Sequence, residues 1–173
     1  MDPEEDEDPN AVTLEGARLV LRRAHEDDRA ALGAILAEPE VVAWWGPYDP
    51  DTAFDELDKS FVIVVGGVVV GWLLFEEETW WQYPSVGFDI ALTTALHGQG
   101  YGQETLRVAI RHFIARGHHR FTIDPAVDNE RAIHTYAAIG FKPVGVMRAC
   151  ERRDGAWHDG LLMDLLADEF IDA

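Results

Sequence analysis

The feature that most limits what this chain can fold into is the glycine-rich segment HGQGYG at residues 97–102. It follows an apolar, strand-like segment at 83–92 and precedes an amphipathic segment at 103–117 with helical spacing. The first N–H groups of a helix lack partners within the helix, and the helix dipole is positive there. Glycines let a phosphate approach these N–H groups, although a tight turn is the simpler interpretation. The spacing is not the dinucleotide fingerprint, because Gln103 replaces a required glycine, and no Gly-Lys-Ser/Thr follows to make a Walker loop.

The remaining pattern predicts a single α/β domain at residues 13–173. A chain of 173 residues has an ordinary single-domain size. Apolar segments bounded by turn residues predict strands, and periodic segments between the later strands predict helical crossovers in a mixed sheet. We expect strands at 17–24, 61–66, 68–76, 83–92, 119–124, 141–150 and 157–166, and helices from a cap at Asp27 or Asp28 to Leu36, within 39–50, and at 52–60, 103–117 and 129–140.

A second motif lies one strand further along the chain. The segment DNERAIHTYAAIGF, residues 128–141, reads as a helix that Asp128 or Asn129 caps and Gly140 ends. Together with HGQGYG it resembles the GCN5-related N-acetyltransferase (GNAT) superfamily, whose coenzyme A loop has the form Arg/Gln-x-x-Gly-x-Gly/Ala. The resemblance extends from about residue 17 to 166. It implies a twisted, mostly antiparallel sheet flanked by helices, with a V-shaped split between two parallel strands.

The resemblance also implies acetyl-CoA as cosubstrate. Its diphosphate would rest on the amides of residues 99–103, and its pantetheine arm would pair with the backbone of residues 89–92. Asn129 would hold the far side of the arm. One departure from the family pattern is His97, which stands where the family has Arg or Gln. The implied coenzyme-binding residues are Ile90, Ala91, Leu92, His97, Gly98, Gln99, Gly100, Tyr101, Gly102, Gln103, Asn129 and Ala132.

Further segments resemble one branch of this superfamily, the aminoglycoside 6'-N-acetyltransferases. That resemblance implies transfer of the acetyl group to the 6'-amino group of an aminoglycoside antibiotic, and hence a resistance enzyme. The N-terminal third agrees least, since only its tryptophan pair and general layout match. The matching segments are VVAWWG (41–46), VGWLLFEEETWW (70–81), GFDIAL (87–92) and IDPAVDNERAIHTYAAIGF (123–141).

A polycationic sugar needs carboxylates at the rim of its site and flat aromatic walls. Asp89 and Asp124 lie on the two splayed strands and are expected to point into the split, although a helix cap or a surface acid is the simpler interpretation of each. The acidic run at 76–78 is expected to contribute, although such runs are usually a solvated face. One tryptophan of each adjacent pair is expected to be exposed, whereas Trp72 reads as core. The candidate substrate-binding residues are Trp45, Glu77, Glu78, Trp81, Asp89 and Asp124.

Acyl transfer to an amine needs a neutral nucleophile, a stabilised oxyanion and a protonated leaving thiolate. Asp89 is the candidate base, directly or through a water, and a backbone N–H near Ile90 or Ala91 can stabilise the oxyanion. Tyr136 is the candidate acid, a role that the family resemblance implies. The histidines are interpreted as surface or turn residues, His134 on the outer side of its helix. No His/Cys/Asp spacing predicts a metal site.

Charge narrows the classes of partner. The formal net charge is -18, with six acids in the first ten residues, and the rest of the chain still carries -12. This argues against nucleic acid and leaves two interpretations, solubility or a cationic substrate. Residues 1–12 are expected to form a disordered acidic tail. The chain has no apolar run of membrane length, no basic secretory leader and one cysteine, Cys150, which fits a cytoplasmic monomer or homodimer with no membrane partner.

Two alternative functions stay open. The layout, including the LRRAHEDDRAAL segment, is also similar to ribosomal-protein alanine acetyltransferases, which implies a peptide N-terminus as acceptor. A protein of another class, a non-catalytic acyl-CoA sensor, would need neither Tyr136 nor Asp89. Thiol release with aminoglycosides would indicate the first function, and release with peptides the second. Failure of thiol release with every amine tested would indicate the sensor.

Overall fold

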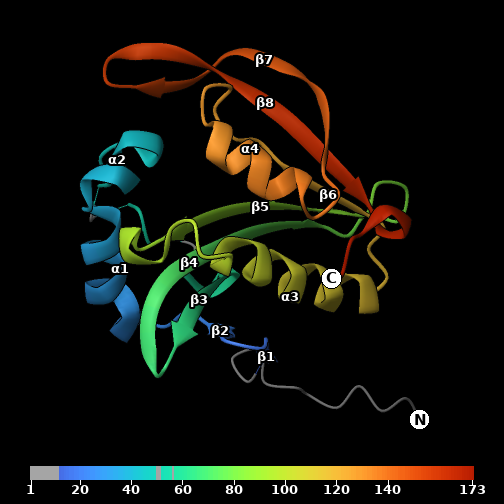
Figure 1. Ribbon diagram of the computed structural model, residues 1–173, viewed down its shortest axis with the longest axis horizontal. Coiled ribbons are helices and arrows are strands. Elements are labelled where there is room, and N and C mark those ends of the chain that lie inside the picture. The colour runs from blue at the N-terminus through green and yellow to red at the C-terminus, as the bar shows by residue number, and fades with distance from the viewer. Residues whose placement is uncertain (1–11, 50–51, 56) are drawn as a thin grey trace.

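The computed structural model describes residues 12–49, 52–55 and 57–173, and it contains one eight-stranded sheet in the order β1-β2-β3-β4-β5-β6-β8-β7 (Figure 1). Neighbouring strands run antiparallel except for β5 and β6, which are parallel. The strands are β1 Thr13–Glu15, β2 Val20–Arg23, β3 Ser60–Val65, β4 Val68–Glu78, β5 Ser85–Leu92, β6 Arg120–Ile123, β7 Lys142–Arg153 and β8 Ala156–Leu166.

Helices cover both faces of the sheet. Alternate residues of the central strands point to opposite faces, so Phe61 and Ile63 join one buried cluster while Val62 joins another. Helices α3 (Tyr101–Ala115) and α4 (Glu130–Ala137) contribute to the first cluster, and α1 (Arg29–Leu36) and α2 (Pro39–Trp45) to the second. The predicted α/β class with a mixed sheet is confirmed.

The sheet splits between its two parallel strands. Strands β5 and β6 pair only at Val86 with Phe121 and at Gly87 with Thr122. Beyond this point β5 continues to Leu92 along β4, whereas β6 pairs with β8. The backbone therefore opens a V-shaped gap whose sides are the last residues of β5 and the loop that follows β6, as the resemblance implied.

Several local predictions differ from the structure. Asp28 does not cap α1 with its side chain, because its carboxylate accepts two hydrogen bonds from Arg22 and one from the His25 N–H, each 2.8 Å long. The helix expected at 52–60 is only a 3-10 turn, Leu57–Lys59, within the described part of that segment. Almost all of the predicted acidic tail lies outside the described residues, and Val12 packs at the margin of the core. Among the helices described, none is long and apolar enough to cross a membrane.

Candidate active site

The glycine loop opens α3 as the sequence predicted. Gly100 has φ +82°, a left-handed conformation that favours glycine, and it precedes the first residue of the helix. The loop borders a cavity of about 800 Å³ that continues between α2, the end of β5 and α4. Free helix N-terminal amides at the edge of a cavity this large form a cradle for a diphosphate, so the residues present fit a coenzyme A molecule.

Eleven of the twelve predicted coenzyme residues border this cavity. The exception is Gln99, whose side-chain amide donates to the Ala95 carbonyl oxygen at 2.7 Å. The others lie on three elements that meet at the split: the end of β5, the glycine loop with the first turn of α3, and the first turn of α4. They are Ile90, Ala91, Leu92, His97, Gly98, Gly100, Tyr101, Gly102, Gln103, Asn129 and Ala132.

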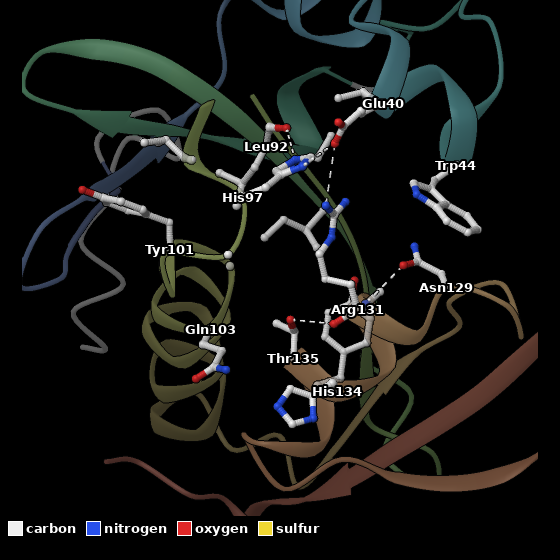
Figure 2. Close-up of a pocket in the computed structure, with 18 of the residues that line it drawn as sticks. Glu40, Trp44, Leu92, His97, Tyr101, Gln103, Asn129, Arg131, His134 and Thr135 are labelled. Carbon is white, nitrogen blue, oxygen red and sulfur yellow. Dashed lines mark hydrogen bonds and ion pairs between the residues drawn. The ribbon is translucent and has the colours of Figure 1, made fainter. Parts of the chain in front are cut away.

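Asn129 caps α4. Its Oδ1 accepts a hydrogen bond from the Ala132 N–H at 3.2 Å, so the side chain is fixed beside the cavity. Because the oxygen is used in the cap, the amide NH₂ group is the part of Asn129 that can donate to a bound molecule. Figure 2 shows Asn129 on the wall opposite the glycine loop.

Three charged or titratable side chains meet between α2 and α4 in this cavity (Figure 2). The His97 Nε2 lies 2.9 Å from the Leu92 carbonyl oxygen, which can only accept, so this nitrogen carries a hydrogen. The Glu40 carboxylate lies 3.6 Å from His97 Nδ1 and 3.8 Å from Arg131 Nη1. His134 also borders the cavity, on the side facing α3, and its side chain is exposed. The helical period of α4 turns residues 131, 134 and 135 toward one side.

A second cavity of about 440 Å³ adjoins the first and contains the predicted catalytic carboxylate. Residues Asp89 and Asp124 point to the sheet face covered by α2, because they alternate with the buried residues Phe88 and Ile123. The two cavities share Trp44, Trp45, Ile90, Asn129, Ala132 and Tyr136. Their common wall therefore lies where the thioester end of a cofactor and an acceptor would meet.

The electrostatics of this second cavity favour a base near neutral pH. The Asp89 carboxylate is open to the cavity but surrounded by protein walls. Loss of hydration, followed by repulsion from Asp124, Glu151 and Glu76, raises the pKa of Asp89 from 3.8 to about 6. Loss of hydration and then Glu151 also raise the pKa of Asp124. Binding of a cationic ligand relieves the electrostatic repulsion within such a cluster of carboxylates.

Tyr136 reaches the common wall from α4. Its side chain packs against the core and is 8% exposed. Burial, with repulsion of a phenolate by Asp89 and Asp124, raises the pKa of Tyr136 well above 10. The hydroxyl therefore stays protonated at neutral pH and can donate a hydrogen bond or a proton to a leaving group.

Both tryptophans of α2 border both cavities, whereas the sequence singled out Trp45. Neighbouring residues of a helix are only about 100° apart around its axis, so Trp44 and Trp45 can both reach the same cavities. Trp44 is held by Arg153, whose guanidinium carbon lies 5.2 Å from the ring centre and whose Nη1 donates to the Ala43 carbonyl oxygen at 2.6 Å. Trp72 is buried in the core, as expected.

Three predicted substrate residues lie outside both cavities. Glu77 lies 2.6 Å from the His118 Nε2 and 3.0 Å from the Arg116 Nη2, so its carboxylate joins β4 to the end of α3. Glu78 accepts from the Trp80 N–H, and Trp81 is 77% exposed in the turn between β4 and β5. The structure therefore does not bring these residues together with Asp89 and Asp124.

Other residues of the site were not found from the sequence. Cys150 and Glu151 border the second cavity because β7 changes register between Met147 and Glu151. The irregularity places Ala149 at φ +48°, with its N–H donating to Asp159 at 2.7 Å. No local sequence signal marks such a bulge. The residues missed also include Glu40, Arg131, His134 and Thr135 at the larger cavity, Met147 at the smaller one and Trp44 at both.

Across the described ranges, no group of three or more His, Cys, Asp or Glu side chains could hold a metal ion.

Three comparisons relate this chain to known proteins. Comparison of the sequence with curated proteins finds no match. Solved structures share the fold: a GNAT-family acetyltransferase from Bacillus anthracis has 17% identity and a TM-score of 0.79, with 91% of this chain and 100% of that chain covered. RimJ of Mycobacterium smegmatis, solved with CoA-disulfide, has 23% identity and a TM-score of 0.79, with 93% and 90% covered. Spermidine N-acetyltransferase from Vibrio cholerae, solved with CoA and spermine, has 19% identity and a TM-score of 0.75, with 88% and 97% covered.

The sequence itself matches a family model over most of its length. Residues 18–142 match the model of the acetyltransferase (GNAT) domain. That range contains the glycine loop, β5, β6 and all of α4, which are the elements that form the split. The chain therefore belongs to the GNAT acetyltransferases, enzymes that transfer an acetyl group from acetyl-CoA.

Proposed function

We propose that this enzyme acetylates a primary amine of a compact polycationic molecule, with an aminoglycoside, at its 6'-amino group, as the first candidate. The observation that carries the proposal is the acceptor cavity, where Asp89, Asp124 and Glu151 lie beside the indoles of Trp44 and Trp45. Burial and neighbouring negative charge raise the pKa of Asp89 and Asp124, and a ligand with several ammonium groups offsets that charge. Indole faces stack on cations and sugar rings.

The residues present divide the reaction between the two cavities. The cofactor supplies an acetyl thioester when bound along the larger cavity. The amides at the start of α3 bind its diphosphate, and the Asn129 amide orients the arm. Asp89 takes a proton from the acceptor ammonium, which leaves a neutral nucleophile. A backbone N–H near Ile90 stabilises the oxyanion, and Tyr136 donates a proton to the departing thiolate.

A peptide N-terminus is the second candidate acceptor. The observation in its favour is the fold shared with RimL, a ribosomal L7/L12 alpha-N-protein acetyltransferase, at 21% identity and a TM-score of 0.77 over 90% of this chain and 94% of that chain. Against it, the acceptor cavity holds about 440 Å³ and three carboxylates, which suits a small polycation better than an extended peptide.

A thiol-release assay tests the proposal. Purified protein with acetyl-CoA is offered kanamycin or tobramycin, spermidine, and short peptides that begin with Ala or Ser. We expect thiol release with the aminoglycosides, and mass spectrometry of the product should show one acetyl group on the 6'-nitrogen. Acetylation of the peptides alone would overturn the polycation proposal, and acetylation of spermidine alone would replace the aminoglycoside within it.

Salt dependence tests the charge of the acceptor site separately. We expect the KM for the aminoglycoside to rise several-fold from low salt to ~0.5 M salt at saturating acetyl-CoA, because mobile ions screen the pairing with Asp89 and Asp124. A monocationic amine acceptor serves as the control and should show a smaller change. An aminoglycoside KM that does not change with salt contradicts an electrostatic acceptor site.

A further inference from the structure

The turn between β1 and β2 contacts the glycine loop through Arg18, which borders neither cavity. The Nη1 of Arg18 donates to the Gln99 carbonyl oxygen at 3.0 Å. Its Nε and its backbone N–H each donate to the carboxylate of Glu104, in the first turn of α3, at 2.7 Å. The guanidinium carbon also lies 4.2 Å from the ring centre of Tyr101. One side chain therefore holds the last residues of the loop and the first turn of the helix together.

The contact with Gln99 fixes the direction of an amide in the loop. The described peptide bonds are all trans, and in a trans peptide the carbonyl and the following N–H point in opposite directions. Because Arg18 holds the Gln99 carbonyl, the Gly100 N–H points away from Arg18. Gly100 borders the larger cavity, whereas Arg18 does not. The hydrogen bond thus directs an N–H donor toward the cavity side of the loop.

The packing at Gly100 supports a close fit between the loop and the guanidinium. A Cβ atom added to Gly100 would lie 3.4 Å from the Arg18 Nη2, and the left-handed backbone there already disfavours any other residue. The ion pair with Glu104 largely neutralises the charge of Arg18, since the two groups are in direct contact. Orientation of the peptide, rather than long-range attraction, is therefore the main effect that Arg18 can have on an anion.

We propose that Arg18 is a positioning residue for the diphosphate site: it holds the Gln99 carbonyl so that the Gly100 N–H and the first amides of α3 face the bound cofactor. The inference rests on the proposed use of this loop for the diphosphate of acetyl-CoA. Arg18 lies 79 positions before His97, the first residue of the loop, and only the fold brings the two segments together. A lysine cannot replace this arginine, because only a planar fork donates to Glu104 and Gln99 from fixed directions.

Calorimetric titration with CoA tests this proposal in Arg18→Met and Arg18→Lys. We expect the Kd for CoA to rise about tenfold in both variants, the effect of losing one well-oriented charged hydrogen bond. The same rise is expected with dephospho-CoA, which keeps the diphosphate. In the wild type, CoA should also move the Gly100 amide proton strongly downfield in an NMR spectrum, and this shift should shrink in the variants. A purely structural arginine would leave the Gly100 shift on binding unchanged.

Arg111→Met is the matched control. Arg111 lies on α3, pairs with Asp172 at 2.9 Å and has a similarly exposed side chain, 48% against 45% for Arg18. It should keep the wild-type Kd. Wild-type affinity in Arg18→Lys, or a loss that disappears with dephospho-CoA, overturns the proposal. If Arg18→Met is much less stable than the control, Arg18→Lys alone decides. A wild-type protein that binds no CoA contradicts the proposed function instead.

Discussion

Replacing Tyr136 by Phe should lower kcat at least tenfold while CoA binding stays unchanged, because the substitution removes only the hydroxyl that protonates the leaving thiolate. The phenol is buried and its pKa is raised, so it is protonated throughout the neutral range and is suited to donate. Steady-state rates at saturating donor and acceptor, together with a CoA titration, measure the two quantities separately.

Phe fills nearly the same space in the core cluster around Phe141, so the variant is expected to fold. A melting temperature close to that of the wild type serves as the control. Wild-type turnover in Tyr136→Phe would refute the role of the phenol as the acid.

Replacing Asp89 by Asn should lower kcat/KM for the acceptor about 100-fold at pH 8, since an amide cannot take the proton of the ammonium. In the wild type, kcat/KM should increase with pH up to about 6, the pKa of Asp89, because only the carboxylate acts as base. The acidic limb of the profile should disappear in Asp89→Asn. A limb that persists there would show that another group titrates.

Asp124→Asn is the matched variant for this profile. It removes one of the charges that raise the pKa of Asp89, so the acidic limb should move to lower pH while the base is retained. An unmoved limb would contradict the coupling of the two carboxylates.

The same pKa shift predicts a stability difference of defined sign. The folded-state pKa of Asp89 lies above the ordinary value of 3.8, so ionisation is harder in the folded protein. Wild-type stability relative to Asp89→Asn should therefore fall as the pH rises from about 4 to about 6, and it should stay lower above that. Melting temperatures at pH 4 and pH 8 measure this difference. The melting temperature of Asp89→Asn should exceed that of the wild type at pH 8 only.

Local interactions explain which parts of the site the sequence could predict. The left-handed glycine before α3, the Asn129 cap and the alternation that buries Phe88 beside Asp89 each depend on residues within a few positions of one another. Such features follow from backbone sterics and from the period of a strand or helix. These local features therefore explain why eleven of the twelve predicted coenzyme residues border one cavity.

The acceptor side depends on distant pairings that the sequence does not encode locally. The acids at 76–78 look as suitable for a cation as Asp89, but Glu77 is held by His118 and Arg116 once β4 lies beside the end of α3. Glu151 enters the cavity only because β7 changes register against β8. Trp44 borders it because Arg153, 110 residues beyond Ala43, holds the end of α2.

The sequence by itself determined the mixed α/β class, the phosphate-type loop at the start of α3 and the elements that carry Asp89 and Tyr136, because periodicity, glycine conformation and helix caps act over a few residues. Only the tertiary structure decided which acids and indoles border the smaller cavity and that Arg18 contacts the glycine loop. Those contacts join β1–β2, α2, α3 and β7, and strand order and register, not local propensity, bring such segments together.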